Sequence, residues 1–194
     1  MLSVILSLVI TVLLSPSCEK DPVVISPKPT PVIEEYKACC GVEPVAGIVF
    51  DTGYYYIPNV FTPNGDSIND VFRPYYGGEI RLFQWIFITN LEKDSTFFYF
   101  DGTLLQGHEK ENWGWDGEVQ TDTGVHIHKG AFRYNLEFRS LKGNLHYVEG
   151  VACSIICDED AKIFKDKAGC FYPQQVGEDF RLDKSIVVTE EGCF

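Results

Sequence analysis

The sequence predicts an all-β fold, an antiparallel β-sandwich followed by a disulfide-rich C-terminal tail. Three observations predict it. Aromatic residues make up 14% of the 194 residues, apolar residues come in short bursts separated by turn residues, and one burst alternates strictly between apolar and polar side chains. Short strands at near-regular spacing are typical of sandwiches, and a hydrophobic content of 45% is enough for one packed domain.

The chain begins with an uncharged apolar run, residues 2–14, which has the length of a signal-peptide core and is too short to span a bilayer comfortably. Small residues then lead to Cys18, and this junction resembles the lipobox at which bacterial lipoproteins are cleaved and lipidated. We therefore expect a signal peptide over residues 1–17 and a lipid anchor on Cys18. The alternative is an ordinary signal peptide that is cut nearby, which would leave Cys18 as a free or paired thiol.

Residues 18–38 are predicted to be a lipid-anchored, Pro-rich spacer, because four prolines fall in residues 19–38 without any hydrophobic period. The charged triplet directly after Cys18, Glu-Lys-Asp, resembles the signal that sends lipoproteins of the Bacteroidota to the outside of the outer membrane. We expect the domain to be held away from the membrane at the cell surface.

The predicted strands begin after Cys39. Six apolar bursts mark them: residues 47–50, 54–61, 80–88, 95–100, 128–138 and 144–156. Within the fifth burst, Phe132, Tyr134, Leu136 and Phe138 share one face, and the polar residues between them share the other. The segment 140–144, Ser-Leu-Lys-Gly-Asn, is predicted to form the hairpin connection to the sixth burst.

Cysteines are numerous for an exported chain, which favours disulfides. With Cys18 set aside for lipid, six candidates remain: Cys39, Cys40, Cys153, Cys157, Cys170 and Cys193. The adjacent Cys39 and Cys40 are expected to reach different partners, because bridging neighbours strains the peptide between them. The pairing itself stays open, as does a zinc site at the Cys153–Cys157 spacing. We expect these bridges to hold the tail, residues 158–194, against the domain.

A polar turn between two apolar bursts offers a candidate metal site. Asn64, Asp66, Asn69 and Asp70 place hard oxygen ligands within seven residues, and Ca²⁺ favours such oxygens. The spacing does not match an EF-hand loop, however. Asn and Asp also form Asx turns without any ion, so the alternative is a purely structural turn.

Two further groups could bind ligands. Trp113 and Trp115 would share a face of a strand and could stack on a sugar ring, unless at least one of them belongs to the core and Asp116 caps the turn. His126 and His128 could hold zinc if a third ligand arrived from elsewhere, such as His108 or His146; otherwise they are exposed loop histidines. The sequence contains none of the common catalytic motifs, so we expect no enzyme.

Three motifs in order, at residues 54–74, 113–119 and 129–138, resemble the gliding-motility-associated C-terminal domain of Bacteroidota proteins. That module often serves as the type B sorting domain of the type IX secretion system. The resemblance covers roughly residues 48–157 and implies that residues 39–157 form a small Ig-like sandwich. It also implies a role in export and surface attachment rather than in catalysis.

A net charge of −12 disfavours nucleic-acid partners. Together these features predict a lipid-anchored protein of the outer membrane, exposed at the cell surface. We expect it to act as a structural or binding component of an adhesion, motility or secretion assembly, with a protein partner. A carbohydrate-binding lipoprotein and a type IX secretion sorting module are the alternatives.

Overall fold

The computed structural model describes residues 34–36, 38–40, 45–49, 53–78, 80–105, 114–140, 142–164, 169–178 and 181–188, together with Glu190 and Cys193. The predicted signal peptide, the lipidation site Cys18, most of the spacer, His108 and Trp113 lie outside these residues. The described chain is mostly β-structure, which confirms the all-β prediction at that level. No helix among the described residues is long and apolar enough to cross a membrane.

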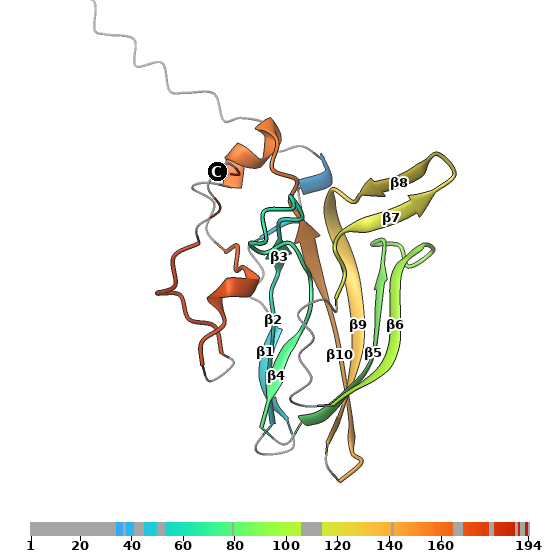
Figure 1. The fold of residues 1–194 in the computed structure, drawn as a ribbon, viewed down its shortest axis with the longest axis vertical. Helices are drawn as coiled ribbons and strands as arrows, with labels where there is room; N and C mark the ends of the chain where they lie inside the picture. The colour runs from blue at the N-terminus through green and yellow to red at the C-terminus, as the bar shows by residue number, and fades with distance from the viewer. Residues whose placement is uncertain are drawn as a thin grey trace, which may run out of the picture.

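The strands form three sheets (Figure 1). The first has the order β1 (Val45–Val49), β2 (Gly53–Ile57), β4 (Tyr75–Gly77). The second has the order β3 (Val60–Phe61), β10 (Leu145–Ser154), β9 (Gly130–Ser140), β5 (Ile80–Thr89), β6 (Thr96–Leu105). A separate hairpin joins β7 (Glu118–Thr121) and β8 (Gly124–Ile127). The short 3-10 helices are η1 (Glu34–Tyr36), η2 (Glu159–Phe164) and η3 (Pro173–Gln175).

The burst at residues 54–61 forms two strands rather than one. Pro58 lies between β2 and β3, and a proline has no backbone N–H to offer a sheet ladder. The chain passes there from the three-stranded sheet to the five-stranded sheet, where β3 runs parallel to β10. Among the strands that the structure describes, the other pairs are antiparallel.

Strands β4, β7 and β8 were not among the predicted bursts. Each is short, and the β7–β8 hairpin is mostly exposed, so its sequence lacks the apolar alternation that reveals a half-buried strand. The predicted hairpin at residues 140–144 is confirmed, because β9 ends at Ser140 and β10 begins at Leu145. Gly143 adopts a positive φ of 84° in that turn.

The alternation in β9 positions the main core. Phe132, Tyr134, Leu136 and Phe138 are all buried, as predicted. Phe138 packs against rings of the three-stranded sheet, since its ring centroid lies 5.2 Å from that of Tyr55 and 5.6 Å from that of Tyr76. The two sheets therefore face each other across an aromatic core, which we call the sheet core. Its buried members are Tyr55, Ile57, Phe61, Phe72, Ile80, Ile86, Ile88, Trp115, Val119, Phe132, Tyr134, Leu136, Phe138, Val148 and Ala152.

A second cluster lies at the β3–β10 edge, where helix η1 and the tail pack (Figure 1). Its buried members, which we call the cystine cluster, are Tyr36, Cys39, Val60, Cys153, Ile155, Ala161, Phe164, Tyr172 and Cys193. The six cysteines form three disulfides: Cys39–Cys153, Cys40–Cys170 and Cys157–Cys193. The prediction that the adjacent cysteines reach different partners is confirmed. The zinc alternative at Cys153 and Cys157 is wrong for this oxidised state, because each sulfur is bonded to a different cysteine.

Candidate functional site

The outward face of the five-stranded sheet carries a group of exposed hydrophobic side chains, which we call the aromatic face. Its members are Phe87, Tyr99, Leu145 and Tyr147, and their exposed fractions are 37%, 50%, 42% and 62%. They lie on the opposite side of the sheet from the core, because inward residues such as Ile86 and Val148 alternate with them along the strands. Three strands, β5, β6 and β10, contribute to this face.

Strand register sets the order of side chains across the face. Phe87 lies opposite Tyr99 on β6 and opposite Asn135 on β9. The rings of Phe87 and Tyr99 pack with centroids 4.3 Å apart. On the next row Tyr147 lies opposite Glu137, and Leu145 then lies opposite Arg139. Hydrophobic side chains and ionic or amide groups therefore alternate across this face.

The polar residues of β9 were predicted to share the solvent face. Glu137 points to that face, but only 4% of it is exposed, because neighbouring side chains cover it. Tyr147 donates a hydrogen bond to its carboxylate, and this bond raises the pKa of the tyrosine. Arg139 Nη2 lies 4.0 Å from Glu137 Oε1. That oxygen has no hydrogen-bond partner within the described part of the chain. The aromatic face thus contains a carboxylate that is shielded from solvent beside Tyr147 and Arg139.

A hollow of about 150 Å³ opens on the same face. Asn135, Leu136, Tyr147, Val148 and Glu149 line it. Lys93, in the β5–β6 turn, forms an exposed ion pair with Glu149 at 3.6 Å. The face therefore has hydrophobic rings, a small recess and a charged margin, which are the features of a surface that contacts another macromolecule.

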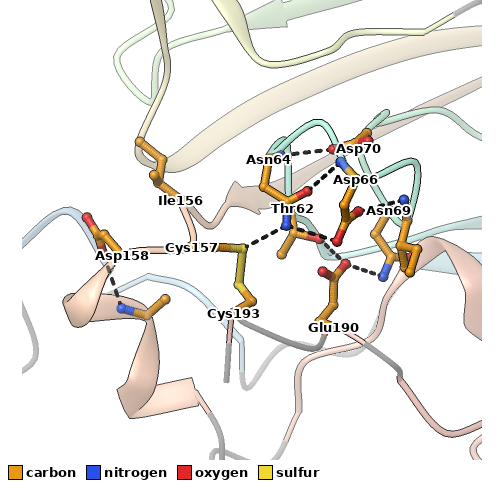
Figure 2. The surroundings of a disulfide bond; sticks show 12 residues. Thr62, Asn64, Asp66, Asn69, Asp70, Ile156, Cys157, Asp158, Glu190 and Cys193 are labelled. Carbon is orange, nitrogen blue, oxygen red and sulfur yellow. Dashed lines mark hydrogen bonds between the residues drawn. A yellow bond between two sulfur atoms is a disulfide. The ribbon is translucent and has the colours of Figure 1, made fainter.

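The predicted calcium residues shape a turn through their own side chains (Figure 2). Asp70 Oδ1 accepts hydrogen bonds from the backbone N–H groups of Asn64 and Gly65, and Oδ2 accepts one from Ser67. Asp66 Oδ1 accepts one from the backbone N–H of Ile68. These bonds are the Asx-type contacts that the structural alternative predicts, and they explain the loop's shape without an ion.

Asn69 points away from the other predicted ligands and toward the tail. Its Nδ2 donates to Glu190 at 2.7 Å, and its Oδ1 accepts from the backbone N–H of Gln174. The structure thus brings Asn64, Asp66 and Asp70 into one turn and uses Asn69 to join that turn to the tail. Whether the turn binds Ca²⁺ stays a prediction.

Glu190 is a residue that sequence reasoning missed. It comes from the tail, is 4% exposed, and accepts hydrogen bonds from Thr62 and Asn69 (Figure 2). Its pKa is raised overall. Burial is the largest cause and the charges of Asp66 and Asp70 add to it, whereas the two hydrogen bonds lower the pKa. No sequence signal could have found this contact, because 121 positions separate Glu190 from Asn69 and the intervening chain must fold first.

The tryptophan and histidine candidates occupy other positions. Trp115 is 1% exposed in the sheet core and therefore cannot present a ring face to a sugar, so the core alternative is correct for this residue. Asp116 accepts a hydrogen bond from the N–H of Glu118 and caps the turn. His126 is exposed on β8, whereas His128 packs 4.6 Å from Phe97 and bonds to the carbonyl of Ala131. Burial lowers the pKa of His128.

The cysteine and acidic residues bring together one group with the composition of a metal site. Cys157, Glu190 and Cys193 place ligand atoms within 4.8 Å of one another, but both sulfurs are in the Cys157–Cys193 disulfide. Among the described residues, no such group includes His126, His128 or His146. The zinc alternative with His146 as third ligand is therefore not assembled among the described residues, and the arrangement with His108 lies outside them.

No family model, curated protein or solved structure matches this chain. The site therefore has to be interpreted from its own geometry.

Proposed function

We propose that this protein is a non-catalytic binding module of an outer-membrane surface assembly, and that it contacts a protein partner through the aromatic face. The observation that carries the proposal is the exposure of Phe87, Tyr99, Leu145 and Tyr147 on one side of one sheet. Aromatic side chains in a well-packed patch with a charged margin contribute most of the binding free energy in many protein interfaces.

Two other features support this reading. Three disulfides support the proposal of an exported protein, because disulfides persist in oxidising compartments, and they agree with the predicted export signal and the lipid anchor predicted on Cys18. The facing sheets are consistent with an Ig-like sandwich of the gliding-motility-associated type, which we propose as the family of the domain. A surface role in adhesion, motility or secretion then follows from the resemblance.

A protein partner fits the face better than a polysaccharide does. The ring centroids of Phe87 and Tyr99 are 4.3 Å apart, so each ring covers part of the other and leaves less ring surface for a sugar to stack on. Leu145 adds an aliphatic side chain, which contributes buried area to a protein contact but offers no ring for stacking. Carbohydrate binding is therefore the second candidate.

The test is quantitative affinity purification of the tagged full-length protein from outer membranes of the cells that produce it, followed by mass spectrometry. The double variant Tyr99→Ala with Leu145→Ala removes two exposed hydrophobic side chains of the aromatic face and keeps the hydrogen bond from Tyr147 to the buried Glu137. We expect it to lower recovery of the partner at least tenfold. Val187→Ala is the matched control, because Val187 is 76% exposed but lies in the tail. It should leave recovery unchanged.

Two results would contradict the proposal. One is that the wild-type protein is recovered without any enriched protein, and the other is that the double variant retains its partner fully. A glycan array provides the remaining comparison. Glycan binding that is lost in the double variant would show that the aromatic face binds carbohydrate, which is the second candidate function.

A further inference from the structure

The carboxylate of Glu190 is only half satisfied by the protein. Oε1 accepts hydrogen bonds from the hydroxyl of Thr62 and from Nδ2 of Asn69, the latter at 2.7 Å. Oε2 is buried as well, yet it has no hydrogen-bond partner within the described part of the chain. A buried carboxylate oxygen without a partner is unfavourable, so a group that binds there would stabilise the folded state.

The surroundings of this oxygen are negatively charged. The Glu190 carboxylate points into the loop 62–70 (Figure 2), and the charges of Asp66 and Asp70 are close enough to act on it. Among the described residues, none of these three carboxylates forms a salt bridge; the lysines and arginines that do form one pair elsewhere. Three acidic groups and no compensating cation create a site that attracts positive charge.

The hydrogen bonds around the loop separate residues that can bind an ion from residues that cannot. Asp70 receives three backbone N–H groups and Asn69 uses both ends of its amide, so these two side chains are already engaged. Asp66 Oδ2 accepts only the amide of Asn64, at 3.2 Å, and it is exposed. A carboxylate oxygen has room for a second contact.

We propose that Glu190 and Asp66 form a binding site for a hard divalent cation, specifically Ca²⁺, where the tail meets the loop 62–70. Carboxylate oxygens are the ligands that Ca²⁺ prefers, and water can complete its coordination. Asp70 and Asn69 shape and position the loop instead of binding the ion. This site replaces the sequence-predicted set of four ligands with one residue from the loop and one from the tail.

The Cys157–Cys193 disulfide positions the tail ligand. Cys193 donates its backbone N–H to the carbonyl of Glu190 at 3.3 Å, and Asn64 Nδ2 lies 3.3 Å from Cys157 Sγ. The bridge therefore lies beside the loop and keeps the tail segment that carries Glu190 next to it (Figure 2). An ion bound by Glu190 and Asp66 would add a further link between the tail and the loop, which the disulfide and the hydrogen bonds of Glu190 already join.

The experiment is a titration of the oxidised full chain with CaCl₂ after chelator treatment, by calorimetry and by thermal unfolding. We expect saturable binding of one Ca²⁺ and a rise of several degrees in melting temperature at millimolar Ca²⁺. Glu190→Gln keeps the oxygen that Thr62 and Asn69 contact but removes the charge, and it should weaken Ca²⁺ binding at least tenfold. Glu178→Gln is the matched control, because Glu178 is an exposed carboxylate of the same tail, and it should bind Ca²⁺ as the wild type does.

A second variant keeps the proposal testable if Glu190→Gln fails to fold. Asp66→Asn preserves the oxygen that accepts the N–H of Ile68, lies on the exposed side, and should also weaken binding at least tenfold. The proposal is overturned if the wild type shows neither heat nor a melting shift with millimolar Ca²⁺. It is equally overturned if Asp66→Asn and the wild type respond alike.

Discussion

The sheet core and the cystine cluster are both buried, but they are held together in different ways. In the sheet core, rings from two facing sheets pack on one another, and strand ladders fix their positions. The cystine cluster brings together irregular segments, η1 and the tail, with the edge of one sheet. These segments have few ladder bonds, so disulfides and side-chain-to-backbone hydrogen bonds hold them instead.

Individual contacts in the cystine cluster show this clearly. Tyr36 accepts a hydrogen bond from the N–H of Ile156 at 2.9 Å, and Asn59 both accepts from the N–H of Phe171 and donates to the carbonyl of Gly169. These side chains satisfy backbone groups that a regular strand would pair with a neighbouring strand. The comparison teaches that an irregular tail can be as buried as a sheet, provided covalent links and polar side chains replace the ladder.

The largest expected effect comes from removing the two bridges of the adjacent cysteines together. Formed alone, Cys39–Cys153 closes a loop of 114 residues and Cys40–Cys170 a loop of 130 residues. Because Cys39 and Cys40 are adjacent, whichever bridge forms second closes only the short ring through residues 153–170. In the chain-entropy model, the first closure contributes about 5 kcal/mol to the free energy of unfolding and the second about 3 kcal/mol.

Removing one bridge by Cys→Ala substitution of both partners should therefore cost about 3 kcal/mol, whichever bridge is chosen, and removing both about 8 kcal/mol. Urea unfolding of the oxidised variants, followed by far-ultraviolet circular dichroism, measures these losses. Strict additivity of the two single-bridge losses would show that the bridges act independently, contrary to this argument.

Truncating one buried ring in each cluster should have a smaller effect and should separate the two regions. Phe132 packs within 4.8 Å of both Phe72 and Trp115 between ring centroids, so Phe132→Ala should cost about 4 kcal/mol and destabilise the whole domain. In the cystine cluster, the ring centroids of Phe164 and Tyr36 are 5.0 Å apart. Phe164→Ala should loosen η1 and the tail while the disulfides keep them attached.

Hydrogen exchange read by mass spectrometry distinguishes these two results. For Phe164→Ala, faster exchange should be confined to residues 34–40 and 155–176, whereas for Phe132→Ala it should extend to β5 and β9. If Phe164→Ala accelerates exchange in β5 and β9 to the same extent, the two clusters form one cooperative unit.

The smallest effect concerns the loop that joins the two regions. Ser67 has a φ of 72°, a conformation that glycine adopts without steric strain, and its backbone N–H, which Asp70 accepts, is kept in Ser67→Gly. We expect Ser67→Gly to raise the free energy of unfolding by about 1 kcal/mol, measured by urea unfolding.

Gly65 in the same loop allows the reverse test, the replacement of a glycine at positive φ by a residue with a side chain. It has a φ of 83°, and a Cβ atom added there would meet nothing within 4 Å, so any loss on Gly65→Ala reports backbone conformation alone. A loss of about 1 kcal/mol is expected. A gain for Gly65→Ala, or a loss for Ser67→Gly, would show that the loop has a different backbone in solution.

Much of the sheet core could be predicted from the sequence, because alternation along β9 is a local property. The outward direction of Tyr147 and Phe87 follows from the same periodicity once their strands are aligned with β9. The aromatic face was nevertheless missed, since periodicity does not say which outward residues from different strands become neighbours. The short strands β7 and β8 were missed because their exposed side chains carry no apolar pattern.

By itself, the sequence determined the strand-rich character, the inward residues of β9, the β9–β10 hairpin and the separate partners of Cys39 and Cys40. All of these depend on neighbours in the chain or on the geometry of adjacent residues. Only the tertiary structure decided that Pro58 divides a strand between two sheets, which cysteines pair, and that Glu190 meets the loop 62–70. The cysteine pairs are 36 to 130 residues apart, and Glu190 is 121 residues from Asn69. These contacts depend on the path of the whole chain, which local periodicity does not encode.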